Sequence, residues 1–158
     1  MDYRKNDWLK RYGLIQKSRD ATWNDLSTLK DEKWIITRLK MYQWSIDEIL
    51  RHMLASEIRY VHQGFDPELP QHSMAVPAQW VGEVFFRFEE KKHVRLKELK
   101  EAFPAVERKS LTLFKESVES DYEKVVKAPW GEEMTLHGLL EAFYLHEHYH
   151  RGRVILDI

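Results

Sequence analysis

The chain contains no cysteine among its 158 residues. Disulfide bonds, thiolate metal ligands and a cysteine nucleophile are therefore excluded, and nothing favours an oxidising compartment. The N-terminus also lacks the basic start and following apolar stretch that a secretory signal requires. The expected location is the cytoplasm.

Long apolar runs and an excess of one charge are missing too. The run from Val84 to Phe86 is among the longest, whereas a membrane span needs ~20 apolar residues. The 25 Lys and Arg residues nearly balance the 26 Asp and Glu residues, for a net charge of −1, and no segment concentrates positive charge. We therefore expect no membrane span and no nucleic-acid partner.

Proline and glycine are scarce, with five and six residues, and long stretches carry apolar residues at three- and four-residue spacing. This pattern is typical of helices, and no convincing strand pair is found. The length suits one domain, residues 1–158, and 43% hydrophobic residues can form its core. The fold class expected is all-α, a four-helix bundle with a long, decorated crossover between the second and third helices.

The first half of the chain predicts two of these helices. Apolar residues from Trp8 to Leu29 indicate one long or broken helix, followed by a linker over residues 30–43. A second helix begins at Ser45, where Ser45 and Glu48 match a capping box, and ends near Gly64. Its inward stripe includes His52.

The second half predicts a loop over residues 64–77, a helical segment over residues 78–90 that extends towards Phe103, and two further helices. Pro104 is well placed in the first turn of the third helix. The expected buried side of that helix comprises Val106, Leu113, Phe114, Val118, Tyr122 and Val125. The last helix is predicted to follow Thr135, a suitable N-cap residue.

Histidine is unusually dense near the C-terminus, where three of the eight histidines lie within residues 146–150. At ~100° per residue, His146 and His150 lie about 40° apart on a helix, whereas His148 points away. Such a pair is either a buried polar pair or two ligands of zinc, nickel or a similar ion. A third ligand is needed, and His52 is the best candidate, because His62, His72 and His93 lie in loop or charged contexts.

Residues 146–150 also match the H-E-x-x-H pattern of zinc peptidases, in which the glutamate activates bound water. Such enzymes normally take a third ligand from downstream, but only eight residues follow His150. Asp157, the one remaining acid, lies too far along the helix to share the ion. A peptidase is therefore disfavoured, although Glu147 remains a candidate base or supporting residue.

The segments Trp44–Met53 and His146–Gly152 resemble the corresponding motifs of the DinB-like superfamily. The resemblance implies a four-helix bundle that holds one divalent transition metal, zinc or nickel, through His52, His146 and His150. Many relatives carry a glutamine soon after the Arg-Gly pair that follows the last histidine. This chain has Arg153 there, which could bind a carboxylate or simply favour the helix end.

The same resemblance implies several functions. The first is a metal-dependent transferase that joins a low-molecular-weight thiol to an electrophile. The second is a hydrolase that acts on a small substrate through metal-bound hydroxide, with Glu147 as a candidate base. A non-catalytic metal-binding stress-response module remains a third, and a homodimer stays open because relatives often form dimers. Trp44, Trp80 and Trp130 are interpreted as packing residues that could also border the site.

Overall fold

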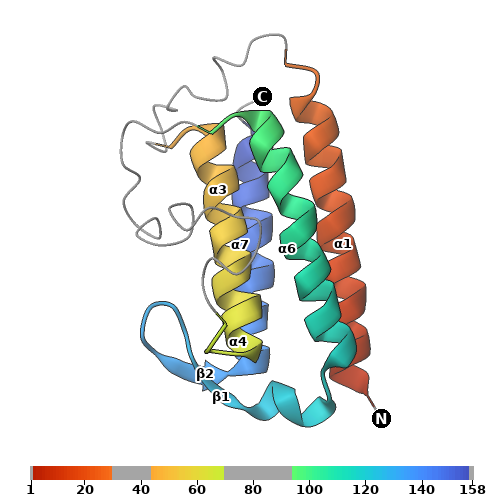
Figure 1. The fold of residues 1–158 in the computed structure, drawn as a ribbon, viewed down its shortest axis with the longest axis vertical. Helices are drawn as coiled ribbons and strands as arrows, with labels where there is room; N and C mark the ends of the chain where they lie inside the picture. The colour runs from red at the N-terminus through yellow and green to blue at the C-terminus, as the bar shows by residue number, and fades with distance from the viewer. Residues whose placement is uncertain (1, 30–43, 70–93, 157–158) are drawn as a thin grey trace.

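The computed structural model describes residues 2–29, 44–69 and 94–156. In this part of the chain, four long helices form a bundle and a two-stranded sheet lies at one end (Figure 1). The helices are α1 (Tyr3–Leu26), α3 (Ile46–Glu57), α6 (Leu96–Glu116) and α7 (Leu136–Leu156). The expected all-α bundle is confirmed.

Each helix packs against two others. α1 contacts α6 and α7, and α3 contacts the same two helices. α1 and α7 run in one direction, whereas α3 and α6 run in the opposite direction (Figure 1). Because α3 and α6 are parallel, the connection between them is a crossover, as predicted. Residues 70–93, with the expected helical segment over residues 78–90, lie outside the described residues.

α1 is one uninterrupted helix. Its buried residues recur at three- and four-residue spacing, which places them on one stripe: Trp8, Tyr12, Ile15, Arg19, Thr22 and Leu26. In the second half of the helix the stripe includes a charged residue, Arg19, and Thr22. The expected linker over residues 30–43 lies outside the described residues.

The second predicted helix begins where its capping chemistry indicates. The backbone N–H of Ser45 donates to the Glu48 carboxylate at 2.7 Å, so Glu48 closes the capping box. α3 then continues into a π-helix, η1 (Ile58–His62), and a last turn, α4 (Gln63–Phe65). The predicted end near Gly64 is confirmed, whereas the π-helical geometry of residues 58–62 was not predicted.

The prediction for the third helix is wrong at both ends. α6 begins at Leu96 rather than at Pro104, which lies inside the helix. Pro104 is exposed, and the buried stripe of α6 continues past it. α6 ends at Glu116, and the predicted Val118, Tyr122 and Val125 lie beyond it. Of these three, only Tyr122 is buried.

A short β-hairpin separates α6 from α7, contrary to the expectation of no strand pair. A 3₁₀-helix, η3 (Glu119–Glu123), leads into β1 (Val125–Lys127), which pairs antiparallel with β2 (Glu133–Thr135). Gly131, in the connecting turn, has a φ of 97°, a conformation that favours glycine. The backbone N–H of Gly138 donates to Thr135 Oγ1 at 3.1 Å, which confirms Thr135 as the cap of α7.

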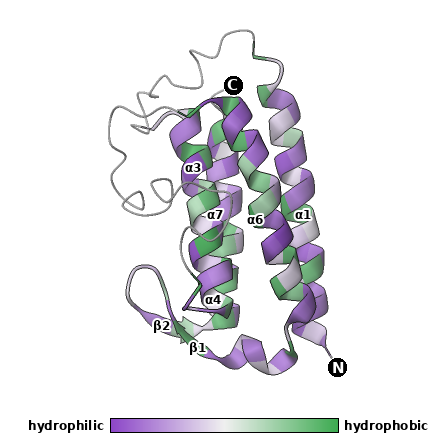
Figure 2. Cartoon of the chain, in the orientation of Figure 1, coloured by the Kyte–Doolittle hydropathy of each residue, from purple (hydrophilic) through white to green (hydrophobic). Residues whose placement is uncertain are grey.

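The buried apolar side chains form two clusters. One contains mainly residues of α3 and the first half of α6, with Leu26 and Val154, and the other contains residues of α1, η1, η3 and α7 near the hairpin. Figure 2 shows hydrophobic and hydrophilic residues mixed along every helix. None of the helices in the described part of the chain combines the length and apolar character of a membrane span.

Candidate metal centre

Two neighbouring helices carry the three histidines of the predicted site. His52 lies on α3, all of whose residues are buried, and His146 and His150 lie one turn apart on α7. α3 and α7 pack against each other, so these side chains meet inside the bundle. The exposed fractions are 5% for His52 and 7% for His150, and His146 is half-buried.

The three imidazoles form a tight cluster. One ring nitrogen from each histidine lies within 4.8 Å of the other two. The Nε2 atoms of His52 and His146 are 2.8 Å apart. The ring centroids of His146 and His150 are 4.3 Å apart, and His52 lies within 4.8 Å of both rings. The structure therefore brings together the three histidines that the sequence analysis grouped.

His148 lies outside this cluster, as its position on the helix predicts. Its ring packs edge-on against Tyr144, with 4.4 Å between the centroids. The side chain is half-buried rather than fully exposed.

Burial keeps the clustered imidazoles neutral. Burial, together with the neighbouring His146 and His150, lowers the pKa of His52 to about 2. Burial and the nearby His150 lower the pKa of His146 to about 3, and burial lowers that of His150 to about 4. Neutral imidazole is the form that binds a metal ion, so at neutral pH the cluster needs no deprotonation.

Aromatic rings surround the histidines. The Trp44 ring stacks nearly parallel on His150, with 6.0 Å between centroids and 5° between planes, and meets His52 edge-on at 4.9 Å. The buried Tyr60 ring lies 5.5 Å from His146. Trp44 therefore packs within the bundle and also borders the site. Trp130 is 41% exposed and packs against Tyr60, and Trp80 lies outside the described residues.

Glu147 and Arg153, the other two site candidates, both have partners. Glu147 is buried, and its carboxylate accepts a hydrogen bond from Arg19 Nε at 2.6 Å. The Arg153 guanidinium lies 4.2 Å from the centre of the Tyr149 ring on the same helix. This contact fits the interpretation of Arg153 as a residue that packs along the end of the helix.

Two further histidines, His62 and His137, lie outside the three-histidine cluster. His62, placed in a loop or charged context by the sequence analysis, is buried, and its Nε2 lies 2.9 Å from Ser110 Oγ. His137 accepts a hydrogen bond from Trp8 Nε1 at 3.2 Å. His72, His93 and Asp157 lie outside the described residues.

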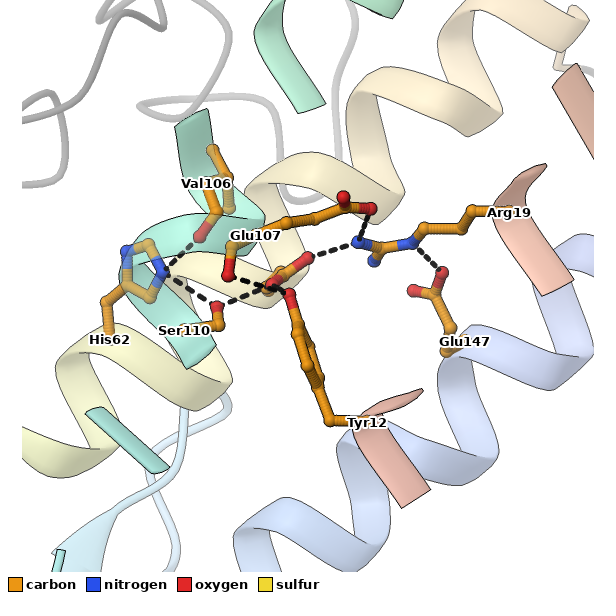
Figure 3. A network of polar contacts seen from close by, with 8 residues as sticks. Tyr12, Arg19, His62, Val106, Glu107, Ser110 and Glu147 are labelled. Carbon is orange, nitrogen blue, oxygen red and sulfur yellow. Dashed lines mark hydrogen bonds and ion pairs between the residues drawn. The ribbon is translucent and has the colours of Figure 1, made fainter. Parts of the chain in front are cut away.

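Figure 3 shows a buried polar network that the sequence analysis missed, one member of which, Glu147, directly follows His146 in the sequence. Its centre is Arg19, which forms ion pairs with Glu57, Glu107 and Glu147. Tyr12 and Ser110 both donate hydrogen bonds to Glu57. The signal was available, because Arg19 falls on the apolar stripe of α1, where a charged side chain needs buried partners.

Burial would raise the pKa of every carboxyl group in this network, but the partners differ. Against burial, Arg19 and the two hydroxyl donors hold the pKa of Glu57 below its usual value. Burial raises the pKa of Glu107 and of Glu147 despite their contacts with Arg19. Glu57 is therefore the most firmly ionised of the three.

The four-helix bundle and the three histidines that two of its helices bring together place the chain in the class of helical-bundle proteins with a candidate metal centre. Within this class the chain belongs to the DinB family, whose family model matches residues 3–157. This membership confirms the resemblance read from residues 44–53 and 146–152. Searches of curated proteins and of solved structures gave no match.

Proposed function

We propose that the protein binds one divalent transition-metal ion through His52, His146 and His150 and uses it in a reaction between small molecules. The observation that carries the proposal is the convergence of three neutral, mostly buried imidazoles from two helices, with ligand nitrogens within 4.8 Å. Membership of the DinB family supports it.

The spacing of two of the nitrogens fits a shared ion. Imidazole nitrogens bind zinc at about 2.0–2.1 Å, so two ligands of one ion lie roughly 3 Å apart. The Nε2 atoms of His52 and His146 are 2.8 Å apart. All-imidazole sites suit zinc and nickel, and three protein ligands leave a position for a substrate.

The chemistry that a bound ion would supply is Lewis acidity, which lowers the pKa of a thiol or a water molecule at the open position. The residues of the chain have other tasks. The stacked Trp44 limits rotation of the His150 ring and covers one of its faces. The buried Tyr60 covers part of the His146 ring and raises the apolar character of that side of the site.

The reaction class that we propose is transfer of a low-molecular-weight thiol to an electrophile, as the family resemblance suggests. Glu147 is not assigned as the base, because its carboxylate bonds to Arg19. The chain contains no cysteine, so the thiol would come from the substrate.

Metal analysis tests the first part of the proposal. Protein purified without a histidine tag should contain one divalent ion per chain. We expect His52→Ala, His146→Ala and His150→Ala each to remove it, whereas His148→Ala, from the same helix but outside the cluster, should retain it. Full metal content in all four variants would refute the site.

Activity assays test the second part. Metal-loaded protein should accelerate conjugation of a thiol to an electrophile beyond the rate given by the same metal and thiol in buffer, and His150→Ala should abolish the acceleration. Turnover of activated esters without any thiol would instead identify a hydrolase. Metal binding without turnover across a broad thiol panel would indicate a non-catalytic module.

A further inference from the structure

The guanidinium of Arg19 contacts all three of the other bundle helices. Arg19 lies on α1, and its Nη1 lies 2.6 Å from Glu57 on α3 and 3.1 Å from Glu107 on α6. Its Nε lies 2.6 Å from Glu147 on α7. The exposed fraction of the Arg19 side chain is 3%. Within the described structure, one rigid planar group thus joins the whole bundle.

Two of the three carboxylates lie on the helices that carry the clustered histidines. Glu147 directly follows His146, and Glu57 lies five residues after His52. On a helix these offsets correspond to about 100° and 140° of rotation, so each helix presents a histidine and a glutamate on different sides. The third carboxylate, Glu107, lies on α6, where the described residues include no histidine.

The ion pairs therefore constrain the helices that carry the histidines. Sliding or rotating α7 against α3 by one residue moves a side chain by about 1.5 Å along the axis and 100° around it. Such a shift would break the 2.6 Å contacts of Arg19 with Glu57 and Glu147. It would also separate the Nε2 atoms of His52 and His146, which lie 2.8 Å apart.

The network also divides the apolar core. Along α1, Arg19 lies between Ile15 of one apolar cluster and Leu26 of the other, and Glu147 lies between Phe143 and Val154 in the same way along α7. Apolar side chains tolerate small sliding movements, whereas paired charges need one register. The polar layer between the two apolar clusters therefore fixes the register of the helices that carry the histidines.

We propose that Arg19 is a positioning residue for the histidine cluster, which it aligns by holding Glu57 of α3 and Glu147 of α7. The inference rests on the proposed metal site and extends it to the residues that set its geometry. A network that only stabilises the fold would affect unfolding but would leave the geometry of the bound metal unchanged.

Cobalt(II) binding tests the role, because the absorption spectrum of cobalt reports its coordination geometry. Arg19→Lys retains the positive charge but loses the two-pronged contact. We expect it to weaken cobalt affinity about tenfold, the lower end of the effect of residues that support metal ligands, and to change the spectrum. Circular dichroism would confirm that the variant is folded.

Glu107→Gln is the matched control. The variant removes one of the negative charges that pair with the Arg19 guanidinium. Glu107 lies on α6, where no histidine is described, and Glu57 and Glu147 remain to pair with Arg19. Its affinity should stay within threefold of the wild type, with an unchanged spectrum. If folded Arg19→Lys behaves in the same way as this control, the positioning role is overturned while the metal site stands.

Glu147→Gln decides the matter if Arg19→Lys does not fold. It leaves two carboxylates beside Arg19, so the guanidinium keeps its countercharge. A positioning role predicts both weaker binding and a changed spectrum. Weaker binding with an unchanged spectrum would indicate only the lost negative charge and would overturn the role. If the wild type binds no cobalt, zinc or nickel, the proposed function itself fails.

Discussion

His62 is buried with its ring nitrogen against a hydroxyl group and a carbonyl group. Its Nε2–H donates to Ser110 Oγ and to the Val106 carbonyl, because a carbonyl only accepts. Burial lowers its pKa below the ordinary 6.5, and Lys109 adds to the effect, although Glu57 opposes it. The folded protein therefore resists protonation at this residue more than the unfolded chain does.

The sign of the resulting pH dependence follows. Below pH 6.5 the unfolded chain binds a proton at His62 that the folded protein excludes, so acid lowers the free energy of unfolding. His62→Gln should flatten the slope of that energy between pH 7 and pH 5 by at most about 1.4 kcal/mol per pH unit. Urea unfolding of metal-free protein at several pH values measures it. Identical slopes for variant and wild type would contradict the assignment.

The Tyr12 hydroxyl group donates a hydrogen bond to the buried Glu57 carboxylate. A hydrogen bond to a charged group contributes about 1.5–3 kcal/mol, so Tyr12→Phe should lower the free energy of unfolding by roughly that amount. Urea denaturation measures the loss. Tyr3→Phe provides a control, because the Tyr3 side chain is 75% exposed and should cost little. An equal, small effect for both variants would show that the hydroxyl group adds nothing.

Residue-level reasoning from the sequence found the histidines but not Arg19. The i,i+4 spacing of His146 and His150 is local, and the apolar stripe predicted for the second helix singled out His52, so helix geometry alone grouped the three. The partners of Arg19 lie 38, 88 and 128 residues away, and only the packed bundle brings them together. Their charges resembled those of solvated surface residues in the sequence.

At the scale of elements, Pro104 weakens α6 from within. A proline in a helix interior costs about 3 kcal/mol relative to alanine, because it removes a hydrogen bond and clashes with the preceding turn. Pro104 is exposed, so its replacement leaves the core intact. Pro104→Ala should therefore raise the free energy of unfolding by about 1–3 kcal/mol, measured as a higher urea midpoint.

Arg108→Ala serves as the control for this prediction. Arg108 is also exposed on α6, and alanine and arginine have similar helix propensities, so the midpoint should change by only a few tenths of a kcal/mol. A lower midpoint for Pro104→Ala would indicate that proline is required at this position.

The helix boundaries divide into those with local and those with non-local causes. Ser45 and Thr135 cap their helices through contacts with residues three positions away, and such local contacts can be predicted from the sequence. α6 starts eight residues before Pro104 because Leu99, Ala102 and Phe103 are buried against other helices. The hairpin strands are three residues long each, too short for alternation to distinguish them from a loop.

At the scale of the whole molecule, a metal ion bound by two helices should stabilise the bundle. A ligand that binds only the folded state adds about 2.7 kcal/mol at a free concentration 100 times its dissociation constant. Zinc or nickel should therefore raise the melting temperature of metal-free protein, and EDTA should reverse the effect. His150→Ala should abolish the rise, and His148→Ala should retain it. Equal shifts in both variants would place the ion elsewhere.

His52 and His146 meet across 94 residues of chain, which bears on the order of events during folding. Contacts so distant in sequence form only after the intervening loop has closed, at a cost in chain entropy. The complete three-histidine cluster therefore cannot exist until α7 has docked on α3. We expect a refolding chain to gain its full affinity for metal in its last kinetic phase, after most of the helical circular-dichroism signal has returned. Metal binding during refolding would then report the docking of α7 on α3.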